Sequence, residues 1–253
     1  MISMKRFFHI SLFFNFLCII SITYALVKIG SPSYIFYLIK NKGQGVVSLK
    51  KHKTSHLKTL PIIEGRIIML GNSITAECEW AELLENPNVL NRGVIGDGTT
   101  DILNRLDDVI AMKPKKIFLL IGVNDLLYLP LSTITENYEK IVNRLLLESP
   151  NTQLYLESVL PIHNSFRRND MKNEDIDILN KNIEQIAQKR NLTYINLNEK
   201  FKSILVTASG ELSLRDTKQT EEGLNPEYSI DGIHLNGKGY LLFKDIISPY
   251  INN

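Results

Sequence analysis

The stretch "KIFLLIG", residues 116–122, is an almost continuous apolar run that is too short for a typical helix. Such runs are typical of strands that are buried on both faces of a parallel sheet. Similar runs recur along the chain, and amphipathic stretches separate them. The candidate strands are 66–70, 88–93, 116–122, 153–159 and 193–197.

Helical patterns lie between and after these runs. The clearest one places Ile176, Leu179, Ile183 and Ile186 on a single stripe. Further helical patterns cover 100–111, 134–148 and 237–248. Alternation of strands and helices predicts right-handed crossovers, and therefore a three-layer α/β/α fold around a doubly wound parallel sheet of about five strands. In such sheets, ligands bind beyond the carboxyl ends of the strands.

Charge is distributed unevenly along the 253 residues. Residues 1–60 contain nine Lys or Arg and no acidic residue, which leaves 20 basic and 27 acidic residues in the rest of the chain. An acidic body behind a basic leader argues against a nucleic-acid partner, because binding nucleic acid requires a basic face on the folded domain.

The leader contains an uncharged apolar segment over residues 7–27, directly after Lys5 and Arg6. Its length suits either an uncleaved membrane anchor or a signal peptide with a long apolar core, and we expect the anchor. The expected location is therefore outside the cytoplasm, with the protein either membrane-anchored or periplasmic or extracellular.

The chain is predicted to have three parts. Residues 1–28 form the signal anchor or signal peptide. Residues 29–62 mix Gly, Ser and Lys without helical or strand periodicity and are interpreted as a linker. Residues 63–253 are expected to form one folded domain. Cys78 in this domain is expected to be a small core residue rather than a nucleophile.

Polar and glycine residues follow the predicted strands. Ser73 lies in "GNS" (71–73), Gly96 in "GVIGDGTT" (93–100) and Asn124 in "GVND" (122–125). A fourth loop, before the last helix, supplies Asp231 and His234 in "DGIHLNGKG" (231–239). All four loops are expected in the crevice at the carboxyl ends of the strands.

These residue types suit acyl transfer. A serine hydroxyl becomes a good nucleophile when a histidine takes its proton and a carboxylate orients that histidine. Asp231 and His234 supply this pair three residues apart, a spacing that brings side chains together on a helical turn. The oxyanion of the intermediate needs fixed donors, which the backbone N–H groups of Ser73 and Gly96 and the carboxamide of Asn124 can provide.

Each motif also has a purely structural explanation. Ser73 could be a helix N-cap, and Gly96 could serve turn geometry alone. Asn124 could cap a helix or form an Asx turn, and His234 could be a hydrogen-bonded loop residue. Their joint occurrence, in this order and at strand ends, favours the catalytic interpretation. A zinc site is not expected, because residues 63–253 contain only two histidines.

The four blocks resemble those of the SGNH, or GDSL, hydrolase superfamily, from about residue 66 to the end. In that resemblance Ser73, Gly96, Asn124 and the Asp231–His234 pair match the serine, glycine, asparagine and D-x-x-H blocks. The second block and "ESVLP" (157–161) look most like the small platelet-activating-factor acetylhydrolase-like and bacterial carbohydrate acetylesterase branch. The resemblance implies a short acyl group and no metal or organic cofactor.

One position departs from the family pattern, which usually has aspartate before the serine, whereas this chain has Asn72. The nucleophile is retained, and we expect activity. The predicted function is removal of a short acyl group, acetyl above all, from a small-molecule or glycan ester, the alcohol being a carbohydrate or a lipid. Alternatives are acetyl transfer to a cell-surface glycan, or a lysophospholipase or thioesterase acting on longer chains. The alcohol half of the substrate and the oligomeric state stay open.

Overall fold

The computed structural model divides the chain into two compact units, Met1–Ser48 and Leu49–Asn253. The residues it describes are 14–17, 21, 44–163, 171–207 and 219–252. Apart from 14–17 and 21, the predicted anchor segment 7–27 lies outside them. Within the described ranges, no helix has the length and apolar character needed to cross a membrane. The three-part division of the chain stays a prediction.

A five-stranded parallel sheet in the order β2-β1-β3-β4-β5 forms the centre of the second unit. The strands are β1 (Ile67–Gly71), β2 (Val89–Gly93), β3 (Lys116–Leu120), β4 (Gln153–Glu157) and β5 (Thr193–Ile195). Every residue of β1 and β3 is buried, as the continuous apolar runs predicted. The order reverses at β1, which is the switch point where such sheets place their ligands.

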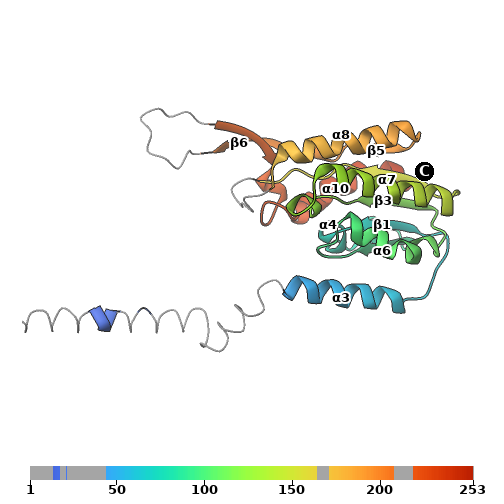
Figure 1. The fold of residues 1–253 in the computed structure, drawn as a ribbon, viewed down its shortest axis with the longest axis horizontal. Helices are drawn as coiled ribbons and strands as arrows, with labels where there is room; N and C mark the ends of the chain where they lie inside the picture. Colours follow the sequence, from blue (N-terminus) through green and yellow to red (C-terminus); the bar gives the residue numbers. More distant parts are fainter. Residues whose placement is uncertain (1–13, 18–20, 22–43, 164–170, 208–218, 253) are drawn as a thin grey trace, which may run out of the picture. The chain divides into compact units, whose positions relative to one another are not determined.

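Helices cover both faces of this sheet, so the predicted three-layer α/β/α fold is confirmed (Figure 1). The helices are α3 (Gln44–Thr59), α4 (Ser73–Ala76), α5 (Trp80–Leu83), α6 (Thr99–Ile110), α7 (Leu131–Glu148), α8 (Asn173–Lys189), α9 (Asn198–Phe201) and α10 (Gly237–Ile251), with 3-10 turns η1 (Asp125–Leu127) and η3 (Pro226–Tyr228). Helices α6, α7 and α8 bury their apolar stripes in one core, while α4, α5, α9 and α10 enclose the other.

The second core connects α10 to the turn that carries Ser73. Trp80 is buried, packs edge-to-face on Phe243 of α10, and donates its indole N–H to the carbonyl of Thr75 at 2.8 Å. Tyr240, also on α10, donates its hydroxyl to the carbonyl of Ile74 at 2.8 Å. These contacts fix the helix that follows the His234 loop against α4.

The interpretation of 29–62 as a linker without regular structure is wrong over Gln44–Thr59, which forms helix α3. Thr54 and Leu57 of α3 line a pocket together with Val109 of α6 and Met112, which lies after that helix. Lys50 of α3 also forms an ion pair with Asp101 of α6, and such interactions between distant parts of the chain leave little trace in local periodicity.

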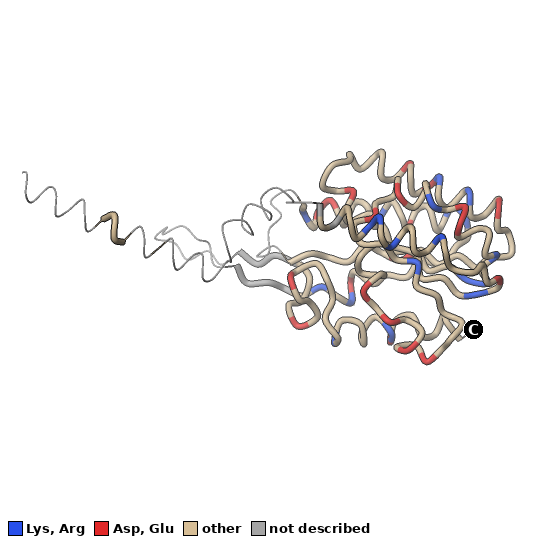
Figure 2. Tube along the Cα trace, turned by 90° about the horizontal axis from the view of Figure 1, so that it is seen from below, with Lys and Arg blue, Asp and Glu red and all other residues tan. Residues whose placement is uncertain are grey.

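Two further strands, β6 (Lys202–Thr207) and β7 (Gln219–Leu224), pair as an antiparallel ribbon apart from the main sheet. The sequence analysis placed no strands there. In the view of Figure 2, acidic and basic residues are interspersed over the second unit.

Candidate active site

Ser73 is the first residue of α4, directly after β1 and Asn72. The N-cap is Asn72, whose Oδ1 accepts the N–H of Ile74 at 3.0 Å, so the alternative interpretation of Ser73 as the cap is wrong. Asn72 is buried, and its amide oxygen does the capping that an aspartate oxygen would do. The departure from the family's aspartate therefore keeps the acceptor and removes a buried charge.

A chain of two hydrogen bonds links Ser73 to the C-terminal loop. Ser73 Oγ lies 2.9 Å from His234 Nε2, and His234 Nδ1 lies 2.7 Å from Asp231 Oδ2. Asp231 Oδ1 also accepts the backbone N–H groups of Ile233 and His234, at 3.0 and 2.8 Å. The carboxylate is thus held in place by its own loop while it contacts the imidazole.

The Asp231–His234 contact was predicted from the spacing of a helical turn, and that geometry is wrong although the contact is present. The two residues lie on a bend, closed by a β-bridge between Ser229 and Leu235. Ser229 Oγ donates to the carbonyl of His234 at 2.9 Å and accepts the N–H of Gly232 at 2.7 Å. Gly232 has φ 85°, a left-handed conformation that suits glycine.

The pKa of the Asp231 carboxyl lies below its ordinary value. Partial burial acts to raise this pKa, but the hydrogen bonds from His234 and Ile233 together outweigh it. Asp231 is therefore an anion at neutral pH, and an anion beside Nδ1 stabilises the imidazolium that forms when His234 accepts a proton.

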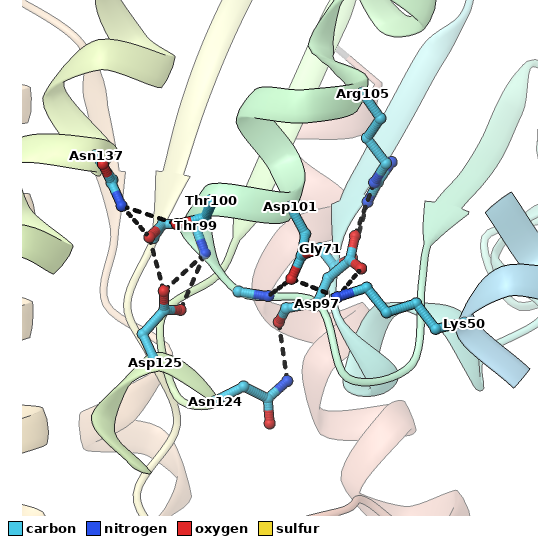
Figure 3. A network of polar contacts seen from close by, with 11 residues as sticks. Lys50, Gly71, Asp97, Thr99, Thr100, Asp101, Arg105, Asn124, Asp125 and Asn137 are labelled. Carbon is cyan, nitrogen blue, oxygen red and sulfur yellow. Dashed lines mark hydrogen bonds and ion pairs between the residues drawn. The ribbon is translucent and has the colours of Figure 1, made fainter. Parts of the chain in front are cut away.

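Gly96 and Asn124 lie on loops that follow β2 and β3. Gly96 has φ 78°, so a glycine suits this position for its backbone conformation. Asn124 Nδ2 donates to the carbonyl of Asp97 at 2.9 Å, as Figure 3 shows, which leaves its second N–H available. Among the residues that the structure describes, no acceptor engages the backbone N–H of Ser73 or of Gly96.

The side chain of Asp97 anchors the Gly96 loop, and the sequence analysis did not identify it. Asp97 is buried, and its Oδ2 accepts Arg105 Nε at 2.7 Å (Figure 3). Arg105 Nη2 also donates to the carbonyl of Gly71, at the end of β1, at 3.2 Å. Burial raises the pKa of Asp97, and Arg105 opposes that rise. One arginine thus ties the loop to the strand that leads to Ser73.

A second buried carboxylate, Asp125, holds the other side of this loop. It accepts the N–H of Thr99 at 2.9 and 3.0 Å and the hydroxyl of Thr99 at 2.7 Å (Figure 3). A Cβ at Gly98 would lie 2.8–2.9 Å from this carboxylate, so Gly98 provides space for the close approach. Burial raises the pKa of Asp125, although the Thr99 hydrogen bonds lower it.

Comparisons with known proteins identify the family and the fold of the chain. The profile of the GDSL-like lipase/acylhydrolase family matches residues 69–242. The acetylxylan esterase of Geobacillus stearothermophilus is 26% identical over 127 residues, which are 47% of this chain and 58% of that protein. The chain thus matches a little over half the length of this curated relative.

Solved structures show the same fold. A Streptococcus pneumonia protein, provisionally described as a platelet activating factor, has a TM-score of 0.68 and 24% identity, covering 87% of this chain and all of that one. A GDSL-like lipase of Bacteroides thetaiotaomicron has a TM-score of 0.64 and 22% identity, covering 80% of this chain and 97% of that one.

A serine, a histidine and a carboxylate in hydrogen-bonded order beyond the strand ends of a parallel α/β sheet are typical of serine hydrolases. Within that class, the chain belongs to the GDSL-like lipase/acylhydrolase family, because the profile of that family covers well over half of its residues.

Proposed function

We propose that the protein is an esterase that removes short acyl groups, acetyl above all, from a carbohydrate or lipid ester. The observation that carries the proposal is the chain from Ser73 Oγ through His234 to Asp231, with contacts of 2.9 and 2.7 Å. The acetyl preference is supported by the similarity to an acetylxylan esterase. The apolar leader supports a position outside the cytoplasm, attached to or released from a membrane.

The first half of the reaction forms an acyl-enzyme. Ser73 Oγ attacks the ester carbonyl while His234 Nε2 accepts its proton, and Asp231 stabilises the resulting imidazolium. The carbonyl oxygen becomes an oxyanion that accepts hydrogen bonds from Ser73 N–H, Gly96 N–H and the second N–H of Asn124. When the intermediate collapses, the bond to the leaving oxygen breaks, and His234 gives its proton to that alcohol.

The second half of the reaction hydrolyses the acyl-enzyme and regenerates the free serine. His234 takes a proton from water, and the hydroxide that forms attacks the acyl carbon within the same oxyanion site. Collapse of this second intermediate releases the acid and returns the proton to Ser73 Oγ. The proposed route uses groups of the chain and one water molecule.

The experiment compares p-nitrophenyl acetate, butyrate and octanoate as substrates of the full chain in detergent. Ser73→Ala is the inactive reference. We expect turnover to fall as the acyl chain lengthens and to disappear with Ser73→Ala. Dominant octanoate turnover would reject the short-acyl assignment in favour of a lipase or thioesterase. Absence of Ser73-dependent turnover on all three esters would reject the hydrolase proposal itself.

A further inference from the structure

Helix α3 contributes a lysine to the loop behind the proposed oxyanion donors. Lys50 Nζ lies 2.5 Å from Asp101 Oδ2 and 3.4 Å from Asp97 Oδ1, as Figure 3 shows. Lys50 belongs to the same compact unit as these two aspartates, but it precedes the 69–242 region that the family profile matches. Membership of the family therefore assigns it no role.

Lys50 faces the oxygen of the Asp97 carboxylate that Arg105 does not contact. Asp97 is 1% exposed, and Arg105 occupies only its Oδ2. Within the described part of the chain, Asp97 Oδ1 has no hydrogen-bond donor, and Lys50 is the cation that faces it. With Lys50 present, the carboxylates of Asp97 and Asp101 lie beside two cations, Lys50 and Arg105. Without Lys50, Arg105 would be the cation left beside two carboxylates, of which Asp97 is buried and Asp101 is partly exposed.

Both partners of Lys50 are connected to the loop that holds Gly96: Asp97 is part of this loop, and Asp101 is hydrogen-bonded to it. Asp101 Oδ2, the atom nearest Lys50, also accepts the N–H of Gly98 at 3.0 Å. The carbonyl of Asp97 accepts the carboxamide of Asn124 at 2.9 Å. Lys50 thus contacts the carboxylate of Asp97, which belongs to this loop, and that of Asp101, which accepts a loop N–H; the loop carries one proposed oxyanion donor and orients another.

We propose that Lys50 is a positioning residue for ester hydrolysis, which balances the Asp97 and Asp101 charges behind the oxyanion donors. The inference rests on the proposed function, because it concerns the same site. Its physical basis is that the reaction develops negative charge at the oxyanion, so an unbalanced carboxylate nearby opposes the transition state more than the ground state. Helix α3 is then part of the catalytic unit rather than of a linker.

The Lys50–Asp97 ion pair is less exposed to solvent than an ordinary surface ion pair. Lys113 and Glu64 also form an ion pair, but their side chains are 73% and 57% exposed, and water screens such pairs strongly. Lys50 is 29% exposed and Asp97 is 1% exposed, so their interaction is screened less.

The test measures kcat and KM of the full chain on p-nitrophenyl acetate. Lys50→Met is expected to lower kcat about tenfold with KM within about twofold, because the unbalanced charge acts on the transition state. Lys50→Arg keeps the charge and is expected to retain most of the activity. The matched control is Lys51→Met, which removes an exposed lysine from the same helix and is expected to behave as the wild type. Thermal unfolding of each variant checks that it is folded.

Second-site neutralisation distinguishes charge balance from a structural role of Lys50. The substitution Asp101→Asn keeps an acceptor for Gly98 N–H and removes one negative charge. The double variant Lys50→Met, Asp101→Asn is therefore expected to recover kcat to within about threefold of the wild type. A structural role would predict that the second substitution leaves kcat low or lowers it further, and that result would overturn the inference.

The outcomes separate the inference from the function on which it rests. A wild type without Ser73-dependent turnover would overturn the proposed function and this inference with it. An active wild type together with an equally active Lys50→Met would overturn the inference alone. Loss of activity in Lys50→Met, its retention in Lys50→Arg and recovery in the double variant are together the expected result.

Discussion

The carboxamide of Asn124 donates one N–H to the carbonyl of Asp97 at 2.9 Å, so the loops after β2 and β3 are joined beside Gly96. The remaining N–H is the proposed oxyanion donor. Asn124→Ala removes both interactions and is expected to lower kcat on p-nitrophenyl acetate by about 10²–10³, with a small change in KM. Asn104→Ala, at an exposed position of α6, is the control. A kcat within threefold of the wild type would show that Asn124 is no oxyanion donor.

Asp231 contacts both its own loop and the imidazole of His234. Asp231→Asn keeps an acceptor for the loop but loses the anion beside Nδ1 and disfavours the required tautomer. We expect kcat to fall by about 10³–10⁴. Steady-state kinetics of this variant and of the exposed α10 control Asp245→Asn measure the effect. A loss smaller than tenfold would contradict the proposed role of Asp231.

Glu157, at the end of β4, is expected to make stability depend on pH. It is 1% exposed, and burial raises its pKa from 4.5 to about 8. The folded state therefore binds the Glu157 proton more tightly than the unfolded state. This contribution to stability is fully present below pH 4.5 and is lost as pH rises towards 8, at about 1.4 kcal/mol per pH unit.

The matched variant for this effect is Glu157→Gln, which has no carboxyl proton to lose. Urea unfolding at pH 5.5 and 7.5 should show the wild type losing stability relative to the variant across this range. If the two proteins keep the same difference in unfolding free energy at both pH values, Glu157 is ionised to the same extent in the folded and unfolded states.

The sequence predicted most of the sheet because strands buried on both faces need apolar residues at every position, a local signal. Helix α3 and the β6–β7 ribbon were missed because neither has a strong local signal. The α3 sequence has weak amphipathic character, so its periodicity does not predict a helix. The ribbon depends on pairing between Lys202–Thr207 and Gln219–Leu224, which no short window of sequence contains.

Some residues of the candidate site were predicted from local motifs, and others were missed because their role depends on pairing in the fold. Ser73, Asn124 and the Asp231–His234 pair were predicted because each lies in a short motif at a strand end or before the last helix. Lys50 was missed because it pairs with Asp97 from a distant part of the chain, and Asp97 was missed because its buried pairing with Arg105 is not visible in the sequence pattern. A buried aspartate in a glycine loop is a weak hint in sequence alone, since the same pattern is common in turns.

Cys78 is expected to be chemically inert. It is buried, and desolvation, with a smaller effect of Glu79, raises the pKa of its thiol from 9.0 to about 12. The reactive thiolate is therefore scarce at pH 8. Esterase activity should survive prolonged treatment with iodoacetamide at this pH. Inactivation that Cys78→Ser prevents would show that this thiol is accessible and close to the chemistry.

The central claim is that Ser73 is a nucleophile activated by His234. The most direct test is intact-mass analysis of the full chain after exposure to diethyl p-nitrophenyl phosphate, which phosphorylates activated serines. We predict a single diethylphosphoryl adduct, located on Ser73 by peptide mapping, and none on Ser73→Ala or His234→Ala. An adduct on another residue, or equal labelling of His234→Ala, would contradict the account.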